Sequence, residues 1–281
     1  MKRVLLCTDG SAYSQVCCQY AAWLAGRVPC EFEVLYVTDL RQFEVPMVAD
    51  LSGSLGVQPY QAVLSKLQEL EVEKAKLVLK DAERLLAEVP AASPPRFTHR
   101  TGFLVDCFQE YEQSADLVML GKRGENANFA SGHLGSTMER VVRASRQPCL
   151  VTSRSFQPIE RVLLAYDGGK SCRRAVEFLA ASPAFRGLEL HVVIVAARAG
   201  EEAALASLRE AEASLVAGGQ TPICQMLHGV AEDEIAAYVA ARGINCLIMG
   251  AYGHSRIRHL VIGSTTTAMM RQCRVPVLLF R

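Results

Sequence analysis

The segment GAYGHSRIRHLVIGST spaces its three glycines in a way that suits the binding of phosphate. Two residues separate Gly250 from Gly253, nine more precede Gly263, and Ser264 and Thr265 follow at once. Glycine permits positive φ and close approach of the backbone to a ligand. A helix that begins at Ser264 would present free N–H groups, the positive end of its dipole and two hydroxyl groups. Together these features predict a site for an anion such as a phosphate chain.

The same pattern occurs once more, earlier in the chain. Its four defining positions are Gly121, Gly124, Gly135 and Ser136. Here ten residues instead of nine separate the second glycine from the third, and Glu125 follows the second glycine. A carboxylate at that place could repel phosphate, although Lys122 and Arg123 would partly offset it. We therefore expect the later copy to be the main site and leave open whether the earlier copy binds the same ligand.

An aspartate follows a short apolar run in each half of the chain, at Asp9 and at Asp167. A carboxylate at the carboxyl end of a parallel strand can accept hydrogen bonds from a ribose hydroxyl or an adenine amino group. The alternative is a purely local role, because the Asp-Gly-Ser sequence at residues 9–11 is also typical of a turn and a helix N-cap. Both interpretations stay open at this point.

Three segments of the chain recur in the same order, which indicates a tandem duplication. MKRVLLCTDGS resembles IERVLLAYDGG, ADLVMLGKRG resembles INCLIMGAYG, and the segment ending in QPCLVTS resembles the one ending in VPVLLF. We expect one domain over residues 1–153 and a second over residues 160–281, which suits the length of 281 residues.

Short runs rich in Val, Leu and Ile alternate with amphipathic helical patterns in each half. The runs are continuous instead of alternating with polar residues, which is typical of a parallel sheet covered on both faces. The strand–helix alternation predicts an α/β fold with two doubly wound parallel sheets of five strands each. The first half also carries an insertion at about residues 40–65, followed by a long helix to about residue 88. This segment is either a longer crossover or a flap over a ligand pocket.

Composition and cysteine spacing argue against nucleic-acid binding, membrane insertion and a zinc site. The net charge of +1 gives no overall field for nucleic acid or an anionic membrane, and no apolar stretch reaches the length of a membrane span. The ten cysteines form no C-x-x-C pair or zinc pattern, so we expect buried thiols in a reducing cytoplasm, with a redox sensor at Cys17 and Cys18 as the alternative. The histidines show no spacing typical of catalysis or of metal binding.

The G-x2-G-x9-G-[ST] spacing, after an aspartate that ends the first strand, resembles the universal stress protein family over the whole chain. The resemblance implies two Rossmann-like domains of the adenine nucleotide α-hydrolase type, and a loop that holds ATP, ADP or AMP, with Mg²⁺ as a possible companion. It also implies pairing of domains through their last strands. PCLVTS and PVLLF would then pair within one chain as an internal pseudo-dimer, and a homodimer is a further possibility.

Three functions are compatible with these observations. The first is a stress-response or regulatory protein that binds adenine nucleotide without efficient catalysis. The second is a slow ATP hydrolase, and the third is a module that carries no nucleotide and binds a protein partner of unknown identity. The glycine loop and its duplication favour the first.

Overall fold

One continuous sheet runs through the whole molecule in the computed structural model, which describes all residues except 44–58, 125–134, 197–199 and 252–262. In the first half the strands are β1 (Arg3–Cys7), β2 (Glu31–Asp39), β3 (Arg96–Gly102), β4 (Leu117–Gly121) and β5 (Cys149–Thr152). In the second half they are β6 (Arg161–Tyr166), β7 (Glu189–Val195), β8 (Ile223–Leu227), β9 (Cys246–Gly250) and β10 (Val277–Phe280).

The strand order is β3-β2-β1-β4-β5-β10-β9-β6-β7-β8. Within each half every pairing is parallel, whereas β5 and β10 pair antiparallel and join the halves. The expected doubly wound sheets, and the expected pairing of the two last strands, are thus confirmed. Pairing removes two apolar edges that would otherwise invite association with other chains.

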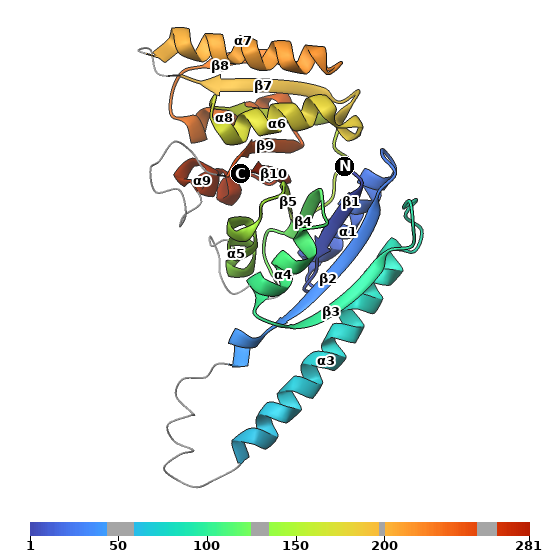
Figure 1. Cartoon of the computed structure of the whole chain (residues 1–281). Helices are drawn as coiled ribbons and strands as arrows, with labels where there is room; N and C mark the ends of the chain where they lie inside the picture. Colours follow the sequence, from blue (N-terminus) through green and yellow to red (C-terminus); the bar gives the residue numbers. More distant parts are fainter. Residues whose placement is uncertain (44–58, 125–134, 197–199, 252–262) are drawn as a thin grey trace.

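Helices cover both faces of the sheet (Figure 1). One face packs against α1 (Ala12–Ala25), α3 (Pro59–Leu86), α6 (Lys170–Ala181) and α7 (Glu201–Ala217). The other face packs against α4 (Leu104–Glu112), α5 (Ser136–Ala144), α8 (Ala231–Arg242) and α9 (Ser264–Gln272). Two short 3₁₀ helices, η1 (Leu40–Phe43) and η3 (Pro183–Phe185), follow β2 and α6. Alternate residues of a strand point to opposite faces of the sheet. Each buried apolar strand therefore contributes side chains to the hydrophobic core on both faces.

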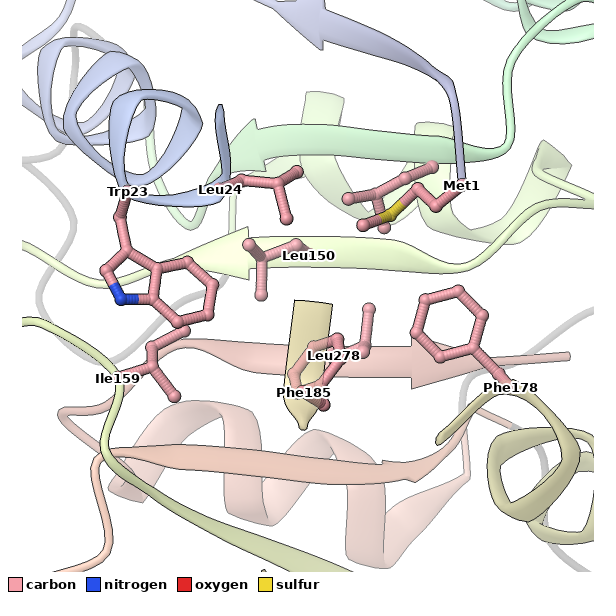
Figure 2. A pocket seen from close by; sticks show the side chains of 9 residues that line it. Met1, Trp23, Leu24, Leu150, Ile159, Phe178, Phe185 and Leu278 are labelled. Carbon is pink, nitrogen blue, oxygen red and sulfur yellow. The ribbon is translucent and has the colours of Figure 1, made fainter. Parts of the chain in front are cut away.

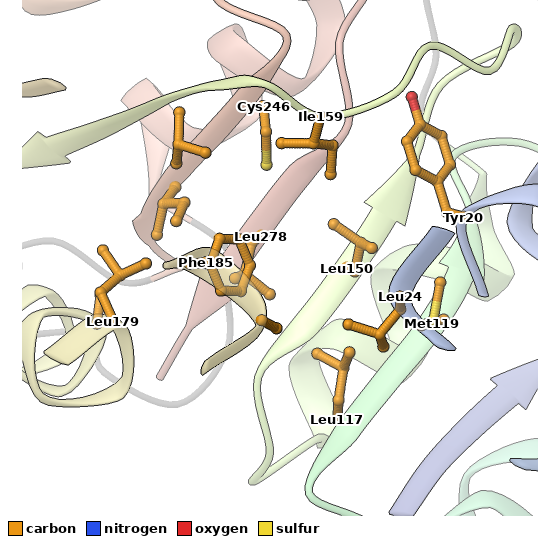
Figure 3. Packing of buried hydrophobic residues seen from close by; sticks show 14 of the residues in the cluster. Tyr20, Leu24, Leu117, Met119, Leu150, Ile159, Leu179, Phe185, Cys246 and Leu278 are labelled. Atoms are coloured by element: carbon orange, nitrogen blue, oxygen red, sulfur yellow. The ribbon is translucent and has the colours of Figure 1, made fainter. Parts of the chain in front are cut away.

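The core on the α1 and α6 face is continuous across the seam between the halves. Leu150 of β5 lies directly opposite Leu278 of β10, and both side chains are buried (Figure 3). A small apolar pocket lies beside them, lined among others by Trp23 from α1, Phe178 from α6 and Phe185 from η3 (Figure 2). The ring of Trp23 packs edge-on against that of Phe185. The two halves therefore share hydrophobic core as well as backbone hydrogen bonds.

The long helix α3 is the crossover between β2 and β3. Ala75, Ala82 and Leu86 are buried, whereas residues 65–70 are all exposed, and Figure 1 shows these first turns extending past the sheet edge. Val78 packs so closely on the β1–α1 turn that a Cβ at Gly10 would lie 2.6 Å from its Cγ2 atom. The described helix thus fits the crossover interpretation, while most of the insertion, on which the flap hypothesis depends, lies outside the described residues.

Close packing of α7 on α6 makes one glycine sensitive to the smallest substitution. A Cβ added at Gly218 would lie 2.6 Å from both Cα and Cβ of Ala180, which cannot rotate away. We expect Gly218→Ala to lower the free energy of unfolding by about 1–3 kcal/mol, as overpacking usually does. Urea denaturation followed by circular dichroism measures this change.

Gly26 is the matched control, because it also caps a helix with a negative φ of −68°. A Cβ there would meet no atom closer than 3.5 Å. Gly26→Ala should leave stability within about 0.5 kcal/mol of the wild type or raise it slightly by restricting the unfolded chain. Equal stability of the two variants would contradict the close contact between α6 and α7.

Candidate functional site

Each glycine loop is closed by a backbone hydrogen bond between its two ends. The N–H of Gly135 donates to the carbonyl of Lys122 at 3.3 Å, and the N–H of Gly263 donates to the carbonyl of Ala251 at 3.1 Å. Lys122 and Gly135 are the equivalents of Ala251 and Gly263, so the two loops are closed at the same positions. The extra residue of the first loop lies between them in sequence. Residues 125–134 of the first arch and residues 252–262 of the second, Gly253 among them, lie outside the described residues. Both loops therefore leave a strand and return beside it to a helix N-terminus.

The first turn of α9 presents the groups expected of an anion site. Gly263 is the N-cap residue and makes no side-chain cap bond, Ser264 is exposed, and Thr265 is half-buried. The first amides of a helix lack acceptors within the helix. The buried Thr266 hydroxyl donates to the carbonyl of Gly250 at 2.8 Å and thereby ties this turn to the end of β9. Sequence analysis missed Thr266, although the run of three threonines is a usable signal.

The first half builds the same arrangement at α5. Gly135 is the N-cap residue, again without a side-chain cap bond, and Ser136 is exposed. Helix α5 therefore also directs its first-turn amides toward the carboxyl edge of the sheet.

The strand-end glycines serve packing instead of unusual backbone geometry. Neither Gly121 nor Gly250 has a positive φ. A Cβ at Gly121 would lie 2.7 Å from the Cβ of Tyr13, and one at Gly250 would lie 3.1 Å from the Cβ of Ser171. Each glycine thus lets the first turn of α1 or α6 approach the strand end, and the expected close approach of this backbone to a ligand stays a prediction.

Both aspartates make the local turn bond. Oδ1 of Asp9 accepts from the N–H of Ser11 at 3.0 Å, and Oδ1 of Asp167 accepts from the N–H of Gly169 at 2.8 Å. The two differ in their surroundings. Oδ2 of Asp9 lies against the loop, since a Cβ at Gly124 would be 2.7 Å away from it, whereas Asp167 is exposed. The structure therefore brings Asp9 and the first glycine loop together, and nucleotide contact by either aspartate stays a prediction.

Lys122 does not stay within its own loop. Its Nζ atom donates to the carbonyl of Cys273, just after α9 in the second half, at 2.8 Å. Burial lowers the pKa of the Lys122 ammonium below its usual range. The expected role, offsetting Glu125, depends on a residue outside the described part of the chain. No local pattern signals this contact, because its partners are 151 positions apart.

An ion pair distinguishes the first half from the second. Nη1 of Arg140 on α5 lies 2.6 Å from Oδ2 of the buried Asp39, which ends β2. Counted from the first helical serine, the position of Arg140 corresponds to Ala268 in α9. The Nε and Nη2 atoms of Arg140 are buried and have no hydrogen-bond partner in the described part of the chain. Sequence analysis missed this pair, which makes the two crevices chemically different.

Most of the cysteines are buried as small hydrophobic residues, and Cys7 and Cys224 are partly buried. All ten are free thiols, and Cys17 and Cys18 are both buried. Burial raises the pKa of Cys18 to about 12 and that of Cys17 well above its usual range, which disfavours the reactive thiolate. Among the described residues, no group of three or more metal-ligating side chains comes together, and no helix is long and apolar enough to cross a membrane.

Two doubly wound parallel sheets, each with a closed glycine loop at a helix N-terminus, define a tandem α/β protein of the Rossmann-like class. The sequence profile described as "Universal stress protein family" matches residues 1–153 and 158–281. This chain belongs to the universal stress protein family.

Individual relatives agree with this assignment. The chain is 45% identical over 288 residues to the universal stress protein Slr1230 of Synechocystis sp., with all of both chains covered. Its fold is similar to a universal stress protein of Archaeoglobus fulgidus, with a TM-score of 0.71 and 23% identity over 99% of this chain and 95% of that chain. It is also similar to the protein PA1789 of Pseudomonas aeruginosa, described as functionally unknown, with a TM-score of 0.65 and 14% identity over 99% and 92% of the two chains.

Proposed function

We propose that this protein binds adenine nucleotide, chiefly ATP, at the second-half loop, and acts as a stress-response regulator without efficient catalysis. The observation that carries the proposal is the hydrogen bond from the N–H of Gly263 to the carbonyl of Ala251, which holds the first turn of α9 beside the end of β9. The N–H of Gly263 is used to close the loop, so the amides of Ser264 and Thr265 remain as donors for a phosphate. Asp167 lies at the same edge for the ribose or the base.

Electrostatics favours the second half over the first. The first loop carries Glu125 directly after Gly124, whereas the aspartates Asp9 and Asp167 occur in both halves and do not distinguish them. A carboxylate near a triphosphate raises its free energy through like-charge repulsion. The second loop has no acidic residue between Gly250 and Gly263 and carries Arg256 and Arg258 instead. The first site is therefore the weaker one.

The proposed ligand, partners and location of the protein follow from this site. The ligand is ATP, with ADP and AMP as alternatives, and Mg²⁺ would accompany the triphosphate. The output is contact with a protein partner of unknown identity in the cytoplasm, and association of two chains into a homodimer is compatible with it. Neither nucleic acid nor a membrane is part of the proposal.

Mass spectrometry of the purified protein after denaturation tests the proposal directly. We expect ATP to be released in up to one equivalent per chain, because the second-half site binds more tightly. Release of ADP or AMP alone would favour the slow hydrolase. A protein that carries no nucleotide and fails to bind added ATP would contradict the proposal and favour the partner-binding module.

A phosphate-release assay separates binding from catalysis. The described donors of the loop suit the ground state of the triphosphate, and binding that does not improve in the transition state does not raise turnover. Hydrolysis also needs a positioned water and stabilisation of the transferring phosphoryl group. We expect turnover slower than about 1 s⁻¹, below the usual enzyme range. A faster rate that Ser264→Ala or Asp167→Ala abolishes would place the protein among the hydrolases.

A further inference from the structure

We propose that Lys122, a residue of the first-half loop, positions α9 and thereby couples the first half to the nucleotide site of the second half. This inference rests on the proposed function and adds a mode of regulation to it. Among the described loop residues, Lys122 donates a side-chain hydrogen bond to the other half.

Lys122 ties together three elements that meet at the seam. Its N–H donates to the carbonyl of Thr152 at the end of β5, at 3.1 Å. Its carbonyl accepts from Gly135 at the start of α5, at 3.3 Å. Its ammonium donates to the carbonyl of Cys273 at the end of α9, at 2.8 Å. Any change in the first-half loop that shifts this backbone therefore moves the ammonium at α9.

The end of α9 is a place where a cation matters. The last carbonyls of a helix lack donors within the helix and carry the negative end of its dipole. Helix α9 has only nine residues, and short helices depend on caps and packing for their order. A helix that is ordered in advance loses less conformational entropy when its other end binds a ligand. Lys122 at Cys273 thus favours anion binding at the amides of Ser264 and Thr265.

The seam carries a second, reciprocal cap. Nη1 of Arg281 donates to the carbonyl of Arg143 at 3.1 Å and to that of Ser145 at 3.4 Å, at the end of α5. Each of the two helices behind a glycine loop is therefore capped by a cation from the other half. Only Lys122 is itself part of a loop, however, because the equivalent residue of the second half is the buried Ala251.

Loss of the hydrogen bond to Cys273 would be unfavourable, because the partly buried Lys122 ammonium would then lack a partner. The side chain is half-buried, and its burial disfavours the charged ammonium. The Cys273 carbonyl supplies the compensating hydrogen bond. Release of Lys122 therefore changes the order of α9 and the hydration of the seam together. By thermodynamic linkage, ligands of the two halves then influence each other's affinity.

Hydrogen exchange with mass spectrometry on the full chain reports on α5 and α9 separately. Without nucleotide, Lys122→Met should speed exchange in the last turn of α9, and Arg281→Met should do so in the last turn of α5. With ATP added stepwise, Lys122→Met should raise the ATP concentration that half-protects the first turn of α9 by about two- to fivefold, the size of effect that a cation at a helix end produces. Lys122→Arg should restore the wild-type value to within about twofold, because the cation is kept.

Three outcomes distinguish the ideas. If ATP protects α9 in the wild type and Lys122→Met does not alter the midpoint, the inference is overturned and the proposed function stands. If Arg281→Met shifts the α9 midpoint as much as Lys122→Met does, general loosening of the seam explains the effect and positioning by Lys122 is overturned. If ATP protects neither helix in the wild type, the proposed function fails and the coupling fails with it, while the nucleotide-free comparison still decides whether the caps exist.

Discussion

Replacing Gly263 with valine should remove the tighter of two ATP-binding events and lower affinity at that site by about tenfold or more, equal to about 1.4 kcal/mol. Gly263 is the N-cap residue of α9, and its N–H closes the loop on Ala251. Valine is among the poorest N-cap residues, and its branched side chain would occupy the space where an anion approaches the first amides. Isothermal titration calorimetry of the full chain with ATP measures both sites.

The equivalent change in the first half is the control for this variant. Gly135→Val alters the N-cap of α5 in the same way and should affect only the weaker event. Circular dichroism and thermal unfolding establish that both variants are folded. The assignment of sites is reversed if Gly263→Val leaves the affinity unchanged while Gly135→Val abolishes binding.

Truncating Leu278 to alanine should cost about 2–5 kcal/mol of unfolding free energy, the usual range for a large apolar side chain removed from a core. The side chain of Leu278 has no exposed surface and lies opposite Leu150 across the β5–β10 pairing (Figure 3). Loss of the Cγ, Cδ1 and Cδ2 atoms at this place leaves a cavity in the core that the halves share. Chemical denaturation with far-UV and near-UV detection measures the change.

Leu77 offers the matched control, since it is also a leucine but 69% exposed on α3. Leu77→Ala should stay within about 0.5 kcal/mol of the wild type, as surface substitutions usually do. A small effect at Leu278, comparable with that at Leu77, would mean that the seam contributes little and that the halves are stable independently.

The local sequence pattern was sufficient to predict the architecture of each half. The continuous Val, Leu and Ile runs predicted buried parallel strands, because a strand covered on both faces has no polar side to show in its sequence. The three repeated segments predicted two copies of one unit. The Asp-Gly-Ser turn at residues 9–11 was also readable, because such a turn forms through contacts two residues apart, and Asp167 makes the equivalent bond.

The pattern of glycines identified the loop but not the task of every glycine. Gly121 and Gly250 were expected to let the backbone approach a ligand, which stays a prediction, and the structure adds that the first turns of α1 and α6 lie against them. The sequence shows which residues are glycines and therefore lack a Cβ. It does not show which group packs into the space that this leaves. That group belongs to an element far away along the chain, so only packing reveals it.

Only the tertiary structure decided which side chains make contacts between the two halves and between helices that are distant in sequence. Lys122 was expected to act within its own loop, and it donates instead to Cys273, at the end of α9. No pattern in the sequence singled out Arg140, and it pairs with the buried Asp39. Long cationic side chains reach several ångströms in many rotamers, so their sequence neighbours do not determine their partners. The sequence by itself determined the two folded units and the location of their loops, while the meeting of β5 with β10 decided which residues could link them.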